Sequence, residues 1–179
     1  DKDTSGLLAV ARTLPSQVSL VNQLKDRSMS RKYLALVYGH PDFQGTIDAP
    51  IDRHRVQRTK MAVVTSGKPA ITHFEIFDKT AHCAWMSVKL ESGRTHQIRV
   101  HMTHIGHPLV GDPVYRQGRP GLGRASSEAQ FLIDSFSRQA LHASVLGLLH
   151  PRTGKLLECE APLPSDLSRL RSELARVDI

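Results

Sequence analysis

The sequence predicts an α+β domain in which a mixed, largely antiparallel sheet is flanked by helices. Short segments of alternating apolar and polar residues recur along the chain, as is typical of half-buried strands. Gly- and Pro-containing turns at residues 66–69 and 151–154 separate pairs of these segments and favour hairpins. Other segments carry apolar residues three or four positions apart, as amphipathic helices do. The sequence contains no internal repeat and no domain boundary, so residues 1–179 are expected to form one domain.

The first half of the chain is expected to place several strands around one helix. Residues 6–11 form an apolar run typical of a buried strand, and Pro15 with Ser16 opens a helix. Residues 31–38 alternate as a strand that ends at Gly39. The remaining expected elements are a turn and short strand at 45–50, a basic loop or hairpin at 51–60, and a hairpin formed by 61–65 and 70–77.

The second half of the chain mixes strands and helices. Residues 82–90 predict a strand with Trp85 on one face and the other apolar side chains on the opposite face. Thr95 is expected to cap the start of a helix that ends at Gly106. The later expected elements are a mobile loop at 116–129, a hairpin formed by 141–149 and 156–160, and a helix after Ser165 that buries Leu167, Leu170 and Leu174.

Positive charge is concentrated in particular segments of the sequence. The formal net charge is +7, and neither residues 53–74 nor residues 94–111 contain an Asp or Glu. Such patches attract polyanions, and charge alone leaves RNA, DNA and anionic membranes as candidate partners. Patches of a single sign suit a phosphate backbone in particular.

The two cysteines give no sign of a disulfide framework or a zinc site. Cys83 and Cys159 each lie in an apolar, strand-like run, which predicts two reduced core thiols in a cytoplasmic protein. No signal peptide and no apolar run of membrane-spanning length is present, so a membrane is not expected as a partner.

Two segments contain the residue types that catalysis requires. Asp1 precedes the turn Thr4-Ser5-Gly6, where an isolated Asp would simply form or cap the turn. Residues 93–101 read Gly-Arg-Thr-His-Gln-Ile-Arg-Val-His and hold two arginines and two histidines. By itself, Arg99 beside an apolar helix face would be a surface residue, and Tyr33 an ordinary half-buried strand tyrosine.

A cluster of histidines suggests metal binding at first sight. His101, His104 and His107 precede Asp112, and imidazole is a common zinc ligand. However, Gly106 and Pro108 interrupt the helix, and the motif His-Glu-x-x-His is absent. We therefore expect no metal site, and a histidine-ligated metal hydrolase remains the rival class of enzyme.

The N-terminal segment 1–6 and the segment 93–101 together resemble the RluA/RluD-type family of pseudouridine synthases. The resemblance implies the catalytic-domain fold of that family, without its upstream part and without its N-terminal RNA-binding domain. It implies an isomerase that needs neither cofactor nor metal, and that acts as a cytoplasmic monomer on a 23S ribosomal RNA stem-loop. Further matches, which extend the resemblance over nearly the whole chain, lie at residues 31–39, 58–63, 67–70, 107–115 and 138–143.

The resemblance also assigns roles to particular residues. Asp1 would act directly on the uridine, Arg99 would pair with Asp1 and orient it, and Tyr33 would lie against the target base. His96, Gln97 and His101 are expected to contact RNA, and the alternative for these three residues is a structural role. A catalytically inactive RNA-binding fragment is the alternative for the chain as a whole. The expected RNA-binding residues are Arg53, Arg58, Lys60, Lys68, Arg94, His96, Gln97 and His101.

Overall fold

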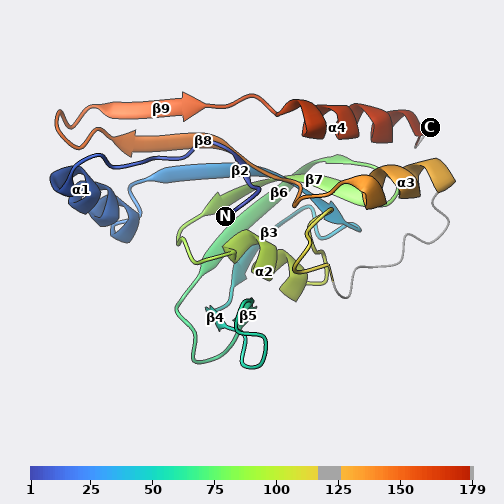
Figure 1. Cartoon of the computed structure of the whole chain (residues 1–179), viewed down its shortest axis with the longest axis horizontal. Helices are drawn as coiled ribbons and strands as arrows, with labels where there is room; N and C mark the ends of the chain where they lie inside the picture. The colour runs from blue at the N-terminus through green and yellow to red at the C-terminus, as the bar shows by residue number, and fades with distance from the viewer. Residues whose placement is uncertain (117–125, 178–179) are drawn as a thin grey trace.

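The computed structural model describes residues 1–116 and 126–177 (Figure 1). Within them, a seven-stranded sheet has the order β1-β8-β2-β7-β6-β3, and β9 also pairs with β8. All strand pairs in this sheet are antiparallel except β1 with β8. The strands are β1 (Ser5–Gly6), β2 (Ser30–Tyr38), β3 (Gln44–Asp48), β6 (Ile71–Lys79), β7 (Cys83–Leu90), β8 (Leu141–Leu149) and β9 (Leu156–Glu160).

Helices cover both faces of the sheet, which confirms the prediction of a largely antiparallel sheet with flanking helices. A separate hairpin of β4 (Ile51–Arg53) and β5 (Met61–Val63) projects beyond the sheet near α2 (Figure 1). Ala84, Met86 and Val88 of β7 pack toward α2, whereas Trp85 packs toward α3 and α4. The central strands are therefore buried on both sides. The helices are α1 (Leu14–Lys25), α2 (Gln97–His104), α3 (Ser127–Ser135) and α4 (Ser165–Val177).

Most predicted elements are present, including the β8–β9 hairpin and α4, whose three leucines are buried. The expected pairing of residues 61–65 with 70–77 is wrong, because β5 pairs with β4 instead. The turn after β5 folds onto β4: Lys68 exchanges two backbone hydrogen bonds of 3.0 Å with Ile51. A Cβ on Gly67 would lie only 2.7 Å from the Ile51 carbonyl carbon, so this approach requires glycine.

The N-terminal and C-terminal edges of the sheet depart from the prediction. The expected buried strand at residues 6–11 is reduced to Ser5–Gly6, and Leu8 and Val10 are exposed. Cys159 is exposed rather than buried, because all five residues of the edge strand β9 are exposed. Part of the loop expected at 116–129 forms the start of α3, and its residues 117–125 lie outside the described residues.

The α1 helix begins earlier than predicted. Thr13 caps it by accepting a hydrogen bond from the Ser16 backbone N–H at 3.3 Å. Its apolar residues Val18, Val21 and Leu24 remain largely exposed. No helix within residues 1–116 and 126–177 is long and apolar enough to cross a membrane.

Candidate active site

Segments distant in sequence surround a cavity of about 380 Å³ on the α2 face of the sheet. The N-terminal residues and β8 form one side of it. Strand β2 and the loop between β7 and α2 contribute the other side. The cavity thus brings two of the three expected catalytic residues, Asp1 and Tyr33, into one site together with Arg31, Gly93, Arg94 and His96.

The N-terminal segment is held against β8 by backbone contacts. The Leu7 backbone N–H donates to the Ala143 carbonyl at 3.0 Å. Gly6 has a φ of 100°, and a Cβ at this position would lie 2.2 Å from the Ala143 oxygen. Only glycine tolerates both this φ and this close approach. Gln139 reinforces the turn, since its Nε2 donates to the Lys2 carbonyl at 2.6 Å.

Arg99 is buried on α2, where its guanidinium bridges two carboxylates. Its Nε and NH2 donate to Asp112 Oδ2 and Oδ1 at 2.7 and 2.9 Å. Its NH1 lies 3.8 Å from Asp1 Oδ2. The expected contact between Arg99 and Asp1 is therefore present, but the two-pronged grip is on Asp112. The planar guanidinium can form two parallel hydrogen bonds with only one carboxylate, so only its NH1 is directed toward Asp1.

Asp112 is a site residue that the sequence reasoning did not assign. It is completely buried, and its Oδ1 also accepts hydrogen bonds from the backbone N–H groups of Val114 and Tyr115 at 2.8 and 3.0 Å. Burial alone would raise the pKa of Asp112, but these hydrogen bonds and the Arg99 charge outweigh burial and lower it. The available signal was that Asp112 is the first acidic residue after Arg94.

Tyr33 lies on β2, where it pairs with Val88 of β7 and faces the cavity. Burial raises the pKa of Tyr33, although the nearby Arg31 charge opposes the shift. The phenol is therefore protonated at neutral pH. Its hydroxyl can donate a hydrogen bond, and its ring provides an apolar surface for a base.

His96 lines the cavity and contacts Tyr115, which packs beside Arg99. His96 Nδ1 lies 2.8 Å from the Tyr115 hydroxyl, which also accepts from the Met61 N–H at 2.9 Å. The Arg99 guanidinium lies 5.0 Å from the centre of the Tyr115 ring. Burial, followed by the Arg99 charge, lowers the pKa of His96, so its ring is neutral at pH 7.

Two of the expected RNA-binding residues, Gln97 and His101, are buried and contact the sheet. Gln97 Nε2 donates to Ile71 O and Thr72 Oγ1, each at 3.0 Å. His101 Nδ1 lies 2.8 Å from Thr72 Oγ1, and its Nε2 lies 2.9 Å from Ala49 O. These contacts fix α2 to the sheet, which is the structural role that remained the alternative for Gln97 and His101.

The other expected RNA-binding residues are accessible. Arg53, Arg58 and Lys68 are exposed near the β4–β5 hairpin, and Lys60 is half-buried there. Arg94 is exposed at the cavity mouth and is anchored by its Nε, which donates to the Pro69 carbonyl at 3.0 Å. These side chains lie on the surfaces around α2.

The histidines do not converge on a common point. His101 uses both ring nitrogens in the buried contacts above, and His107 Nδ1 lies 2.8 Å from the Tyr38 carbonyl. Within the part of the chain that the structure describes, no three His, Cys, Asp or Glu residues are grouped to hold a metal ion.

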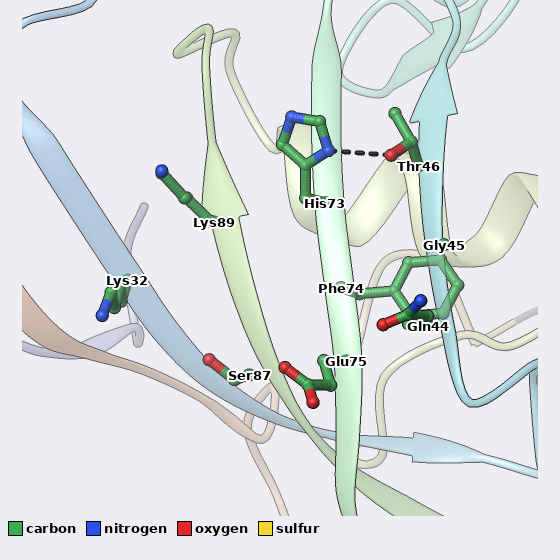
Figure 2. Close-up of a pocket in the computed structure, with 9 residues that line it drawn as sticks. All are labelled: Lys32, Gln44, Gly45, Thr46, His73, Phe74, Glu75, Ser87 and Lys89. Atoms are coloured by element: carbon green, nitrogen blue, oxygen red, sulfur yellow. Dashed lines mark hydrogen bonds between the residues drawn. The ribbon is translucent and has the colours of Figure 1, made fainter.

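A larger hollow, of about 520 Å³, lies on the opposite face of the sheet. Figure 2 shows Lys32 and Lys89 projecting from neighbouring strands beside Glu75 and Ser87. Thr46 Oγ1 and His73 Nδ1 are 2.8 Å apart at its rim. Because successive strand residues face opposite ways, Lys32 points away from the cavity that Tyr33 lines.

Comparisons with known proteins found a matching family model and several similar sequences. A family model described as RNA pseudouridylate synthase matches residues 1–104. Ribosomal large subunit pseudouridine synthase D of Escherichia coli (strain K12) is 50% identical over 179 residues, which are 99% of this chain and 54% of the relative. The protein of that name from Pseudomonas aeruginosa is 53% identical over 175 residues, or 97% and 54% of the two chains.

A solved structure agrees with the fold as well. Human RNA Pseudouridylate Synthase Domain Containing 1 superposes with a TM-score of 0.72 at 28% identity, covering 98% of this chain and 77% of that one. The chain spans about half the length of the curated relatives it matches.

Proposed function

The chain belongs to the RNA pseudouridylate synthase family, and on that premise we propose that the protein isomerises uridine to pseudouridine in large-subunit ribosomal RNA. One observation carries the proposal. Asp1 and Tyr33 line one cavity, and the buried Arg99 reaches Asp1 from α2. The names of the relatives, which specify the ribosomal large subunit, support the choice of RNA.

The proposed reaction is a rearrangement within one nucleotide. The bond between N1 and C1′ breaks, the base rotates, and C5 bonds to C1′. C5 loses its hydrogen and N1 gains one, so no net oxidation occurs and neither a cofactor nor a metal is required. We assign Asp1 to act on the nucleotide as an anion. Arg99 lies 3.8 Å from the Asp1 carboxylate, while Asp112 holds Arg99 in place.

Tyr33 contributes a stacking surface and a hydroxyl donor in this proposal. Its protonated phenol follows from burial, which raises its pKa. A uridine flipped out of its stem-loop would place its base on the ring beside Asp1. The rest of the stem-loop, which we take to belong to 23S ribosomal RNA, would lie along the basic surface. The proposed RNA-binding residues there are Arg53, Arg58, Lys60, Lys68, Arg94 and His96.

We further propose that the protein acts as a monomer in the cytoplasm. All the proposed catalytic groups come from one chain, so the site needs no residue from a second copy.

The test uses an RNA stem-loop from 23S ribosomal RNA that carries tritium at C5 of uridine. The full-length gene product should release tritium, and nuclease digestion of the RNA should yield pseudouridine. The 179-residue chain is assayed in parallel for release and for RNA binding. Binding without release by this chain would make it an inactive RNA-binding fragment. Failure of the full-length protein to form pseudouridine in any 23S segment would contradict the proposed function.

A further inference from the structure

Arg31 is a charged group in the cavity for which no carboxylate partner lies among the described residues. It lies on β2 two positions before Tyr33, so the two side chains face the same side of the sheet. Its Nε is buried and has no hydrogen-bond partner among the described residues. Two other arginines, by contrast, are paired with a carboxylate: Arg99 with Asp112, and Arg171 with Asp78. Arg31 thus retains hydrogen-bond donors that an anion could use.

Gly93 makes room for this guanidinium. A Cβ built on Gly93 would lie 2.5 Å from Arg31 NH1, so any other residue would displace the Arg31 head group. Gly93 is the first residue of the motif that supplies Arg94, His96 and Arg99. The motif therefore also determines where the Arg31 charge sits.

Arg31 stands where the active-site cavity meets a second one. The second cavity, of about 410 Å³, shares Arg31, Gly93 and Arg94 with the first. Lys25 and Arg27, at the end of α1, also line it. Its acidic residue, Glu91, is paired with Arg27 and with His73 Nε2. The second cavity consequently keeps an excess of positive charge next to the catalytic carboxylate.

A partly buried cation without a counter-ion is unfavourable in the free protein. Burial lowers the pKa of Arg31, which shows the same cost, although arginine remains charged at neutral pH. A phosphodiester would relieve this cost, because it presents an anion and acceptors for the guanidinium fork. A nucleotide with its base on Tyr33 and its sugar at Asp1 carries such a phosphate out of the cavity.

We propose that Arg31, together with Arg94, binds a backbone phosphate of the target nucleotide and directs the flanking strand into the second cavity. This inference rests on the proposed function, because it takes RNA to be the substrate. It adds Arg31, Lys25 and Arg27 to the basic residues that the sequence suggested. It also predicts that RNA leaves the active site past α1 as well as along the β4–β5 hairpin.

The structure supplies a matched control for the test. Lys32 follows Arg31 on the same strand and points into the hollow of the opposite face (Figure 2). Arg31→Gln and Lys32→Gln each remove one positive charge from β2. Arg31→Gln should raise the Kd for the stem-loop roughly tenfold, as loss of a charged hydrogen bond does. The slope of log Kd against log salt should fall by roughly 0.7 to 1. Lys32→Gln should leave both unchanged.

Two further variants guard against misfolding. Arg31→Lys retains the charge and should recover part of the affinity. Gly93→Ala retains every charge but displaces the guanidinium, so it should weaken binding as Arg31→Gln does. Thermal unfolding of each variant checks that the fold persists.

The decisive arm replaces the backbone phosphates next to the target uridine, one at a time, with neutral methylphosphonates. At one position the replacement should weaken binding to the unaltered protein and have no further effect on Arg31→Gln. Additive losses at every position would overturn the proposal. The proposal would also be overturned if Arg31→Gln bound RNA normally but reacted more slowly in a single turnover, because Arg31 would then act by positioning Asp1.

Binding is measured without turnover, so an inactive protein that binds RNA would contradict the proposed reaction while leaving this test intact. Absence of any RNA binding would overturn both.

Discussion

The Arg99–Asp112 pair predicts that Asp112→Asn damages both stability and catalysis. Asp112 is fully buried and accepts four hydrogen bonds, two of them from Arg99. Asparagine would turn an N–H₂ group toward donors and leave the buried guanidinium without its close counter-ion. Removing one partner of a buried ion pair costs about 3–5 kcal/mol. Asp1, 3.8 Å from Arg99, offsets part of this cost, so we expect a loss of about 3 kcal/mol in the free energy of unfolding.

The assay combines denaturant unfolding with single-turnover formation of pseudouridine. The rate should fall about a hundredfold or more, because a misplaced Arg99 no longer orients Asp1. Asp78→Asn is the matched control: Asp78 accepts two hydrogen bonds from Arg171, but both side chains are more than 40% exposed. It should cost less than about 1 kcal/mol and leave the rate unchanged. A similarly small cost for Asp112→Asn, with normal turnover, would refute the reasoning.

The pH dependence gives an independent check on the same pair. The pKa of Asp112 is lower in the folded state than in the unfolded state. Its stabilising contribution is therefore complete above the unfolded-state pKa and is lost as the pH falls through the folded-state pKa. The stability difference between the unaltered protein and Asp112→Asn should hold at neutral pH and shrink below about pH 4. A difference that does not change in acid would contradict the lowered pKa.

Three other substitutions separate the roles of the remaining residues. Arg99→Lys should slow single-turnover chemistry about a hundredfold, because one ammonium cannot grip Asp112 and face Asp1 together; an effect on RNA affinity alone would make Arg99 a phosphate contact. Tyr33→Phe should bind RNA normally but react roughly a hundredfold more slowly, whereas Tyr33→Leu should also lose the stacking energy; a normal rate for Phe would limit Tyr33 to stacking. Arg58→Ala should weaken binding to many RNAs and flatten its salt dependence. Its control is Arg152→Ala, because Arg152 is exposed in the turn between β8 and β9; an equal loss there would show that only net charge matters.

The sequence predicted those elements whose residue pattern is local. In β7, the alternation of Ala84, Met86 and Val88 with Trp85 gave the strand and the assignment of its two faces. The stripe Leu167, Leu170 and Leu174 gave α4 in the same way. The pairing of β5 depended instead on the backbone of Ile51, which approaches Gly67 only in the folded chain.

The site was harder to predict, because its contacts join distant segments. Arg99 has two carboxylates within reach, and its residue type does not reveal that its two parallel hydrogen bonds go to Asp112. Gln97 and His101 are polar residues in a motif that was expected to contact RNA, which favoured exposure. Their burial depends on Thr72, whose hydroxyl contacts both side chains. Arg31 passed unnoticed, since only the structure shows a buried Nε without a partner.

The central claim is that Asp1, rather than its buried neighbour Asp112, acts on the uridine. The most direct measurement is single-turnover tritium release from C5-labelled RNA by Asp1→Asn in the full-length protein. Asn keeps the shape of the side chain and removes the anion. Within residues 1–116 and 126–177, the one ion pair of the Asp1 side chain is the 3.8 Å contact with Arg99, so RNA affinity and unfolding free energy should stay close to those of the unaltered protein. We predict no detectable tritium release; a rate within about tenfold of the unaltered enzyme, or roughly 1.4 kcal/mol in the barrier, would contradict the account.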